Sequence, residues 1–580
     1  MTIISPNKDV EGRLSDIVHK EHDWFWRHEG SENLLAYIAL VASGSGLSAE
    51  SATEDKVLDA IASSPVSEGS REHLEKLISE GSVGFVRSLM RSFSADELRD
   101  IVLHHDPKSF RTSTTVYTTD PSKPSSLREL GARLLNLEPD DCLADFNCGD
   151  GAFLVNAVEK YSVSSVYFHD IWPDKSCLAE ARLRLLGIDC PLDNAFIFSD
   201  EHLRSFDKIF DAPPLVRVSF LSGAKTPYLK PILDGSDPMG RPSSADWLYC
   251  RLAYDSLREG GTAVVIITNG ATINGGDANA RRYFVENGMV RASVALPAKL
   301  SPDSNVNFTL LVLGKNNGPI RLVDATDLGT PGRRTNTLSD GAISEIEARL
   351  SHDGDMSRLA SRKEFAARDY SLYAPRYLGK GPELVNPTHL GDLAVSIERG
   401  ASIRAADLDE LSTQEDTGLY FLRLADISDG SFSDDLQRLK SVDPSSERQW
   451  LRSGDLVLSK SGAPFKVAVA DVPDGSTVLA SGNLYIIRLD TERVDPYFVA
   501  AFLASEDGKR SLECMVVGTT IPSLPLRNLR NVQVPVPDMD TQRRVAATYR
   551  ANLDQIAVLK IRLDSARAAL SDSYDEEMGR

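Results

Sequence analysis

The stretch Asp145-Phe-Asn-Cys-Gly-Asp-Gly-Ala-Phe153 indicates the fold most clearly, because it joins an apolar run to a segment with helical spacing. The run CLADF (142–146) predicts a buried strand, and LVNAVEKY (154–161) predicts a helix. Glycines in such a strand–turn–helix unit let the backbone approach a ligand, and the first helical turn offers unpaired N–H groups. We therefore expect a ligand site here. The chain has no Gly-Lys-Ser/Thr sequence, which argues against a P-loop.

Short β-rich runs alternate with helical stretches from about residue 142 to residue 315, which predicts a mainly parallel sheet with helices on both faces. Three acids follow successive runs: Asp145, Asp170 and Asp200. Because a carboxylate accepts two hydrogen bonds, Asp170 is a candidate for binding ribose hydroxyls and Asp200 for binding an adenine amino group. Each is also compatible with a solvated turn carboxylate, Asp200 more so than Asp170. The later runs are SVYFH (165–169), AFIF (195–198), DKIF (207–210), TAVVIIT (262–268), ASVALP (292–297) and FTLLVLG (308–314).

Roughly residues 110–330 resemble the amino-group DNA methyltransferases, specifically the methylation subunit of type I restriction–modification systems. In that family the Asp-x-x-Cys-Gly-x-Gly-x-Phe turn binds S-adenosylmethionine, so the resemblance implies this cofactor and a Rossmann-like class I methyltransferase sheet. Phe146 replaces the usual Pro, and Thr115-Val-Tyr-Thr118 resembles the segment that borders the methionine end of the cofactor. The implied cofactor-binding residues are Tyr117, Thr118, Asp145, Cys148, Gly149, Asp150, Gly151, Phe153, Asp170, Ile171 and Asp200.

The segment Asp211-Ala-Pro-Pro-Leu215 departs from the reactive motif of this family, which reads Asn-Pro-Pro-Phe or Asp-Pro-Pro-Tyr. In the family the Asn oxygen and the following carbonyl accept the N6 hydrogens of adenine, and the ring stacks on the extruded base. Ala212 and Leu215 replace these groups, whereas Pro213 and Pro214 remain. Asp211 is the nearby acidic substitute, but it lies one residue early, on the opposite side of a strand.

Two interpretations of this motif stay open. The chain is either a sequence-specific adenine-N6 DNA methyltransferase with a degenerate motif, or an inactive pseudo-methyltransferase that recognises DNA and recruits a partner. A third possibility, a built-in nuclease, has little support, because residues 1–112 contain no convincing Pro-Asp…(Asp/Glu)-x-Lys arrangement.

The second half resembles a target recognition domain of a type I specificity subunit, over about residues 388–548. GDLVLSKSG (454–462) and VPVPDMDTQRR (534–544) carry most of this resemblance, which implies double-stranded DNA as a partner. Residues 386–580 hold 30 acidic and 22 basic residues, so their charge gives no independent support. The implied DNA contacts, each of which is also compatible with an ordinary surface residue, are Lys460, Ser461, Lys466, Arg527 and Arg530.

A heptad pattern near the C-terminus predicts a long helix with an apolar seam. This helix either packs on its own chain or pairs with a second copy, which would set the spacing of two recognition domains. We expect a homodimer through this helix or a complex with a separate restriction or motor subunit. The seam residues are Val545, Tyr549, Asn552, Ile556, Leu559, Leu563, Ala566 and Leu570.

A chain of 580 residues is too long for one hydrophobic core. The net charge of −20 excludes a binder held by bulk positive charge. Six cysteines without a Cys-x-x-Cys pair argue against a zinc site, and the lack of a long apolar stretch predicts a cytoplasmic protein without membrane contact. The expected parts are a helical domain (1–112), a methyltransferase-like domain (113–330), a connector (331–387), a target recognition domain (388–540) and a coiled-coil-like helix (541–580).

Overall fold

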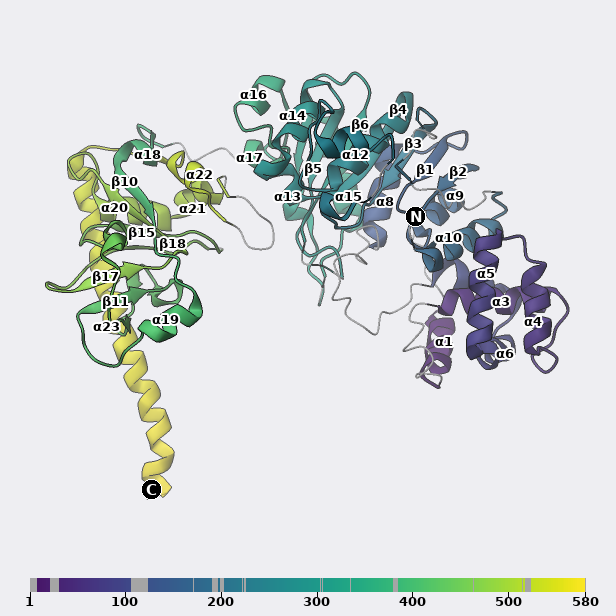
Figure 1. Ribbon diagram of the computed structural model, residues 1–580, viewed down its shortest axis with the longest axis horizontal. Coiled ribbons are helices and arrows are strands. Elements are labelled where there is room, and N and C mark those ends of the chain that lie inside the picture. The colour runs from purple at the N-terminus through teal and green to yellow at the C-terminus, as the bar shows by residue number, and fades with distance from the viewer. Residues whose placement is uncertain are drawn as a thin grey trace. The chain divides into compact units, whose positions relative to one another are not determined.

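The computed structural model divides into two compact units, Met1–Leu378 and Gly379–Arg580 (Figure 1). Among the described residues, no helix is both long and apolar enough to cross a membrane. The described residues are 8–20, 31–105, 124–170, 172–189, 197–198, 203–221, 223, 226–302, 304, 306–333, 335–378, 384–462, 464–513, 515–516 and 523–578.

An eight-stranded mixed sheet forms the centre of the first unit. Its strands are β1 (Cys142–Asp145), β2 (Ser165–Phe168), β3 (Phe206–Asp211), β4 (Leu257–Thr268), β5 (Val290–Ala295), β6 (Phe308–Gly314), β7 (Ile320–Asp324) and β8 (Ser357–Ala360). Their order is β2-β1-β3-β4-β6-β5-β7-β8. The pairs β1–β2, β1–β3 and β3–β4 are parallel, whereas β6 is antiparallel to β4 and β5. The expected α/β class is confirmed, but the sheet is mixed rather than mainly parallel, because β6 and β8 run antiparallel to their neighbours.

Two hydrophobic clusters accompany this sheet. The helices of this part are α8 (Ser125–Leu135), α9 (Ala152–Tyr161), α10 (Pro173–Leu185), α11 (Lys230–Asp234), α12 (Asp246–Ser256), α13 (Asn269–Ile273), α14 (Ala278–Glu286), α15 (Asp340–Ser351), α16 (Arg362–Ala366) and α17 (Pro375–Leu378). Trp247 of α12 and Phe284 of α14 lie in one cluster, and Phe153 of α9 and Ile346 of α15 lie in the other. The strands are therefore apolar on both sides, as expected for a sheet covered by helices.

The structure differs from the connector expected at residues 331–387. Helix α15 buries Ile343 and Ile346 in a core cluster, and β8 pairs antiparallel with β7. These elements are short and lie at the sheet edge, so most of their residues face water and their composition is polar. The described residues 335–378 therefore belong to the first unit.

The N-terminal region is helical, as expected. Its helices are α1 (Lys8–Lys20), α3 (Glu32–Gly44), α4 (Glu54–Ala62), α5 (Glu68–Leu77), α6 (Val83–Ser92) and α7 (Ala95–His104), with a π-helical turn at Ile78–Ser82. Their core includes Cys177, Leu178 and Ala181 of α10. Glu180 of the same helix accepts hydrogen bonds from the Ser67 N–H at 2.8 Å and the Ser67 hydroxyl at 2.7 Å, at the start of α5. Helix α10 thus joins the helical layer to the sheet.

The second unit is built on small sheets. Its strands are β9 (Thr388–His389), β10 (Ala394–Arg399), β11 (Leu419–Leu422), β12 (Ile427–Ser428), β13 (Ser431–Phe432), β14 (Gln437–Arg438), β15 (Leu456–Ser459), β16 (Val467–Val469), β17 (Thr477–Ala480), β18 (Leu484–Leu489) and β19 (Gln533–Val534). The two larger sheets have the orders β10-β18-β15-β16 and β14-β11-β17. The helices are α18 (Leu390–Leu393), α19 (Ala405–Leu411), α20 (Pro496–Ala504), α21 (Glu506–Glu513), α22 (Leu526–Arg530) and α23 (Met539–Met578).

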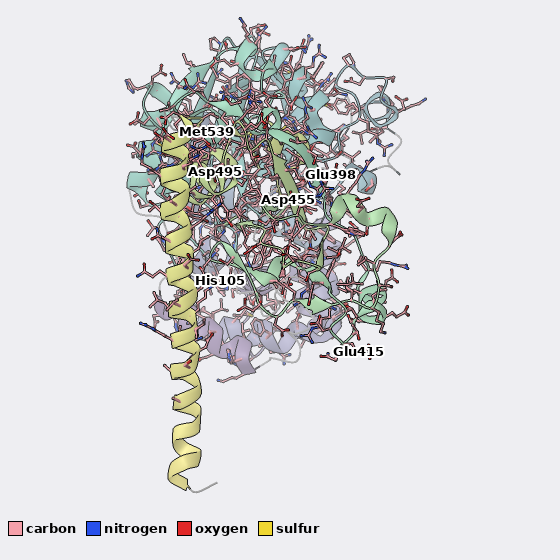
Figure 2. The ribbon with its side chains drawn as sticks, turned by 90° about the vertical axis from the view of Figure 1, so that its left-hand side faces the viewer. His105, Glu398, Glu415, Asp455, Asp495 and Met539 are labelled. Atoms are coloured by element: carbon pink, nitrogen blue, oxygen red, sulfur yellow. The ribbon has the colours of Figure 1, made fainter. Side chains whose placement is uncertain are left out.

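Helix α23 is anchored at its beginning and extends beyond the other elements of this unit (Figure 1). Near Met539 and Asp495, labelled in Figure 2, the buried Gln542 accepts a hydrogen bond from the Asp495 N–H at 2.9 Å. Farther along, Lys560 forms an ion pair with Asp429 at 2.9 Å. The described side chains after Lys560 are exposed, so the last part of the helix has no cover within its own unit.

Candidate functional site

The glycine turn lies between β1 and α9, where the sequence predicted it. Gly149 and Gly151 have φ of 55° and 79°, in the left-handed region that favours glycine. The Gly149 N–H donates a hydrogen bond of 2.9 Å to Asp170 Oδ2, and the other oxygen of Asp170 accepts one of 2.9 Å from the Trp172 N–H. Asp170 therefore holds the turn from the end of β2, and its carboxylate remains partly exposed.

The second glycine is required by helix packing. A Cβ on Gly151 would lie 2.8 Å from the Cβ of Ala179 in α10, closer than two carbon atoms can approach. Two other residues of the motif also face the core: Cys148 is 3% exposed, and Phe153 stacks on Phe210 with ring centroids 3.9 Å apart. The shape of the turn thus depends on core contacts of Gly151, Cys148 and Phe153 as well as on the hydrogen bonds of Asp170.

Asp150 forms an ion pair that the sequence analysis did not foresee. Its carboxylate lies 2.9 Å from Arg182, a buried residue of α10. Arg182 also donates to the carbonyl of Val102 at 2.7 Å and to that of His105 at 3.1 Å, at the end of α7. Desolvation is the largest influence and raises the pKa of Asp150, but the charges of Arg182 and Arg128 together with hydrogen bonds outweigh it, and the pKa is lowered. The charge of Asp150 is therefore already compensated within the chain.

A hydrogen bond connects the glycine turn to the motif that departs from the family. Strands β1 and β3 are parallel neighbours, and the Asn147 side-chain amide donates to Asp211 Oδ1 at 2.7 Å. Asp211 is fully buried, and among the described residues its Oδ2 has no hydrogen-bond partner. Burial raises the pKa of Asp211 to about 7; Asn147 lowers it in part, and the nearby charge of Asp246 adds to the increase. The turn and the motif therefore lie side by side.

Position 212, where the resembling family has Asn or Asp, has no side-chain hydrogen-bond acceptor in this chain, because it is Ala. Ala212 is 3% exposed and belongs to an apolar cluster. Asp211 is directed to Asn147, so its carboxylate does not stand in for a group at position 212. Pro213 is buried, and Pro214 and Leu215 are partly exposed.

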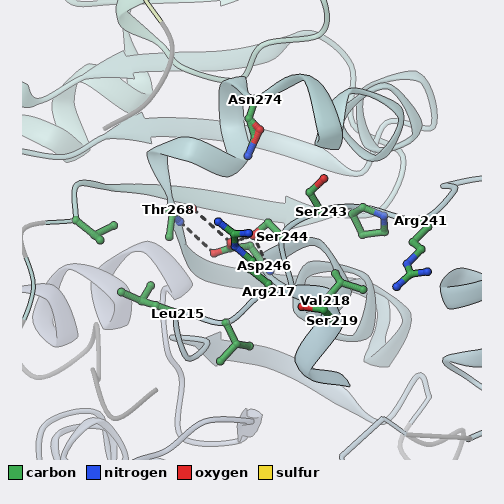
Figure 3. A pocket seen from close by; sticks show the side chains of 13 residues that line it. Leu215, Arg217, Val218, Ser219, Arg241, Ser243, Ser244, Asp246, Thr268 and Asn274 are labelled. Atoms are coloured by element: carbon green, nitrogen blue, oxygen red, sulfur yellow. Dashed lines mark hydrogen bonds between the residues drawn. The ribbon is translucent and has the colours of Figure 1, made fainter. Parts of the chain in front are cut away.

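A cavity of about 690 Å³ adjoins this motif, with Leu215 on one wall (Figure 3). Asp246, at the start of α12, lines it as well. The Thr268 N–H donates to Asp246 Oδ1 at 3.1 Å, and the Thr268 and Ser244 hydroxyls donate to Oδ2. Burial raises the pKa of Asp246 to about 6 despite these hydrogen bonds. The sequence analysis missed Asp246, because a single carboxylate before a helix is indistinguishable from an ordinary cap.

The five expected DNA contacts fall into two groups in the second unit. A β-bridge joins Ser461 to Ser523, and the Leu524 N–H donates to the Lys460 carbonyl at 2.8 Å. This brings the loop of Lys460 and Ser461 to the segment that leads into α22, where Arg527 and Arg530 are exposed. Lys466 is separate: its Nζ donates to the Leu424 carbonyl at 3.0 Å.

Four expected cofactor residues lie outside the described residues: Tyr117, Thr118, Ile171 and Asp200. Residues 190–196 and 199–202, which include the first half of the expected run AFIF, also lie outside the described residues. Ile197 and Phe198 are described and buried.

Comparisons with known proteins agree with this geometry. Residues 112–384 match the model of the family described as N-6 DNA Methylase. The methylase subunit of the type I restriction enzyme MpnII from Mycoplasma pneumoniae is 23% identical over 288 residues, which cover 45% of this chain and 53% of that protein. The specificity subunit of the type I enzyme MjaVIII from Methanocaldococcus jannaschii is 25% identical over 115 residues, covering 19% of this chain and 26% of that protein.

The chain thus spans about half the length of the curated methylase subunit and about a quarter of the specificity subunit. A crystal structure of a type I methyltransferase subunit from Streptococcus thermophilus has a TM-score of 0.47 and 19% identity, covering 60% of this chain and 80% of that one. The large mixed sheet resembles class I methyltransferase folds, and the matched family implies S-adenosylmethionine as cofactor. Residues 112–384 thus match the N-6 DNA Methylase family model, and this part of the chain is similar to the methylase subunits of type I restriction enzymes.

Proposed function

We propose that the chain binds S-adenosylmethionine at the turn 145–151 and recognises DNA with its second unit, while transferring methyl groups to adenine N6 weakly or not at all. The observation that carries this function is the contrast between an intact cofactor turn and a motif without an acceptor. The turn keeps its backbone shape through Gly149 and Asp170, whereas Ala212 presents only a methyl group.

The residues of the turn fit the cofactor. Asp170 is partly exposed and lies at the end of β2, held by hydrogen bonds of 2.9 Å from the Gly149 and Trp172 N–H groups, and a carboxylate is the kind of acceptor that two ribose hydroxyls need. When bound, the cofactor would supply a sulfonium methyl group. Asp150 is a weaker candidate for a direct contact, because its charge is paired with Arg182.

Two losses at the motif reduce methyl transfer. Removal of one positioned hydrogen-bonding group costs on the order of 10²–10³ in rate, by analogy with oxyanion-hole donors. Loss of the stacking ring at Leu215 costs about 1–3 kcal/mol of base binding. Asp211 does not compensate, because its carboxylate is buried against Asn147.

The cofactor part is tested by thermal unfolding with S-adenosylmethionine. A ligand at 100 times its Kd stabilises the native state by about 2.7 kcal/mol, so the native chain should show a higher Tm. Asp170→Asn should weaken this increase, whereas Asp140→Asn, an exposed carboxylate before β1, should leave it unchanged. An unchanged Tm for the native chain at saturating cofactor would refute binding.

The catalytic part is tested by transfer of a labelled methyl group to DNA of mixed sequence. We expect little transfer by the native chain and an increase in Ala212→Asn, with a further increase when Leu215→Phe is added. Efficient transfer by the native chain would contradict the proposed loss and favour an active adenine-N6 methyltransferase.

We infer that residues 388–540 act as the target recognition domain for double-stranded DNA. The bridge between Ser461 and Ser523 places the Lys460 loop next to α22, so Lys460, Arg527 and Arg530 form one candidate surface. Replacement of Lys460 or Arg530 by Ala should weaken DNA binding. Each variant should also reduce the slope of the logarithm of the binding constant against the logarithm of the salt concentration by about the share of one phosphate contact. Arg510→Ala, on α21, is the matched control; an equal loss in this variant would refute the assignment.

We also propose that α23 pairs two copies of the chain. The seam residues Ile556, Leu559 and Leu563 are 37%, 54% and 51% exposed within their own unit, although they are apolar. Two chains that bury this seam in a coiled coil would carry two recognition domains, one for each half of a two-part DNA site. Replacement of Leu559 and Leu563 by Glu should yield monomers in sedimentation, whereas Ile561→Glu, more exposed but outside the seam, should not. A monomeric native chain would instead favour a separate subunit as partner.

A further inference from the structure

Asp211 is a buried carboxyl group with one unused oxygen atom. It is fully buried, and among the described residues it forms no ion pair. Its Oδ1 accepts the hydrogen bond of the Asn147 amide, whereas its Oδ2 has no partner within those same residues. A buried carboxylate is costly unless a positive charge or further donors compensate it. The chain therefore holds an uncompensated acid one residue before the motif that departs from the family.

The sheet places Asp211 beside the glycine turn. Strands β2, β1 and β3 lie in this order and are parallel, so their carboxyl ends meet at one edge of the sheet. The turn follows β1, and it lies between Asp170, just after β2, and Asp211, the last residue of β3. Neighbouring strands are about 4.8 Å apart. Asp211 is thus about one strand spacing from the turn, and Asn147, a residue of the turn, is hydrogen-bonded to it.

The groups that face Asp211 from the neighbouring elements supply no positive charge among the described residues. Helix α12 packs against β3 and contributes Asp246, Tyr249 and Cys250, each of which interacts electrostatically with Asp211. Val265, its register partner on β4, is apolar. The described surroundings of this carboxyl group are therefore neutral or acidic.

The cations of the nearest helix lie on the other side of the sheet. Helix α8 covers the opposite face of β3, where its Gly131 contacts the ring of Phe210. Adjacent residues of a strand face opposite sides, so α8 with its Arg128 and Arg133 is separated from Asp211 by the sheet. Burial raises the pKa of Asp211 to about 7. The group therefore changes charge near neutral pH, and a cation bound nearby would favour its ionised form.

We propose that Asp211 makes the cofactor site selective for charge, so that S-adenosylmethionine, a sulfonium cation, is preferred over its neutral thioether form, S-adenosylhomocysteine. This inference rests on the proposed cofactor site at the turn 145–151. The sulfonium sulfur is bonded to C5′ of the ribose, so a cofactor with its ribose at Asp170 carries its positive charge close to the edge where Asp211 lies. Asp211 acts through its charge and needs no direct contact, because Coulomb attraction persists over several ångströms in a protein interior.

The selectivity depends on pH, because only the ionised carboxylate attracts a cation. Asp211 is largely protonated at about pH 5.5 and largely ionised at about pH 8. If the ionised form binds the sulfonium about tenfold more tightly, the ratio of the Kd of the thioether to that of the sulfonium should increase about five- to tenfold between these pH values. By the same linkage, S-adenosylmethionine should release about half a proton from Asp211 near pH 6.5, whereas S-adenosylhomocysteine should release none.

Calorimetric titration of the full chain with each ligand, at about pH 5.5, 6.5 and 8, tests the proposal. Asp211→Asn has no charge at this position at any pH, so its ratio of the two Kd values should not show the increase of the native chain. Ionisable groups of the ligands contribute equally in both chains, and Asp140→Asn, an exposed carboxylate, should behave as the native chain does. Titration in two buffers of different ionisation enthalpy counts the released protons on the native chain, so this measurement does not depend on the folding of a variant.

The outcomes separate this inference from the function on which it rests. Binding of both ligands with a ratio that does not change with pH contradicts the charge selectivity alone. The same increase in Asp211→Asn as in the native chain, or its loss in Asp140→Asn, also overturns the assignment to Asp211. Binding of neither ligand at any pH instead refutes the proposed cofactor site, and this inference with it.

Discussion

The buried carboxyl group of Asp211 should make the first unit less stable as pH rises, and Asp211→Asn should remove that penalty. Its pKa is about 7 in the folded chain, against an ordinary value of 3.8. Because this folded-state pKa is raised, the native state binds more protons than the unfolded state between these values. Stability from this group is therefore present below about pH 4 and is lost as pH rises to about 7.

The size of the effect follows from this difference. One pH unit corresponds to 1.36 kcal/mol, so ionisation of Asp211 costs on the order of 4 kcal/mol at pH 8 and about 1.5 kcal/mol at pH 5. Asn resembles the protonated carboxyl in shape and charge and can still accept the hydrogen bond from Asn147. For a unit as large as Met1–Leu378, the entropy of unfolding is large, so a change of about 4 kcal/mol in unfolding free energy changes the Tm by about 5 °C.

The assay is thermal unfolding from pH 4 to pH 8, followed by calorimetry or circular dichroism. Asp211→Asn should raise the Tm at pH 8 by about 3–5 °C, with an increase that shrinks toward pH 4. Asp140→Asn, an exposed carboxylate, controls for the general loss of one negative charge. A lower Tm for Asp211→Asn at pH 8, or the same increase at every pH, would contradict the assignment of a buried ionisable group.

Three further substitutions test the contacts that α10 makes with the glycine turn and with the N-terminal helices. Gly151→Ala should destabilise the first unit by about 2–4 kcal/mol in denaturant titrations, because its Cβ would collide with Ala179 and φ is 79°. Arg182→Leu should cost about 1–3 kcal/mol in the same titration, since it removes the ion pair with Asp150 and leaves the Val102 and His105 carbonyls without their donor; an unchanged stability would argue against these contacts. Glu180→Gln should speed limited proteolysis of the N-terminal helices, as it weakens their hydrogen bonds to α10.

Local sequence patterns were sufficient to predict the turn and its flanking elements. The glycines at 149 and 151, the apolar run before them and the helical spacing after them all act within about 20 residues. The position of the motif beside this turn also followed, because neighbouring parallel strands bring their carboxyl ends to one edge. Whether Asp170 and its neighbours contact a cofactor stays a prediction.

Contacts between distant segments could not be predicted in the same way. The hydrogen bond between Asn147 and Asp211 joins residues 64 positions apart. The alternation of side chains along a strand predicts which face of the sheet Asp211 lies on, but it does not predict which residue Asp211 contacts. Arg182 is one of several charged residues in α10, so the sequence did not reveal that it binds the end of α7 and Asp150. The cavity beside Leu215 requires residues from several loops, including Asn274, that share no local pattern.

Helix α10 contributes to two cores at once. Ala179 and Leu183 pack in the cluster of the sheet, whereas Cys177, Leu178 and Ala181 pack among the N-terminal helices. A fragment that begins after residue 112 would expose this second apolar side of α10 to water. It would also leave the guanidinium of Arg182 without its acceptors, the Val102 and His105 carbonyls. Truncation is thus a poor route to an isolated sheet domain, and any shortened version without the N-terminal helices would need new residues on the side of α10 that they cover.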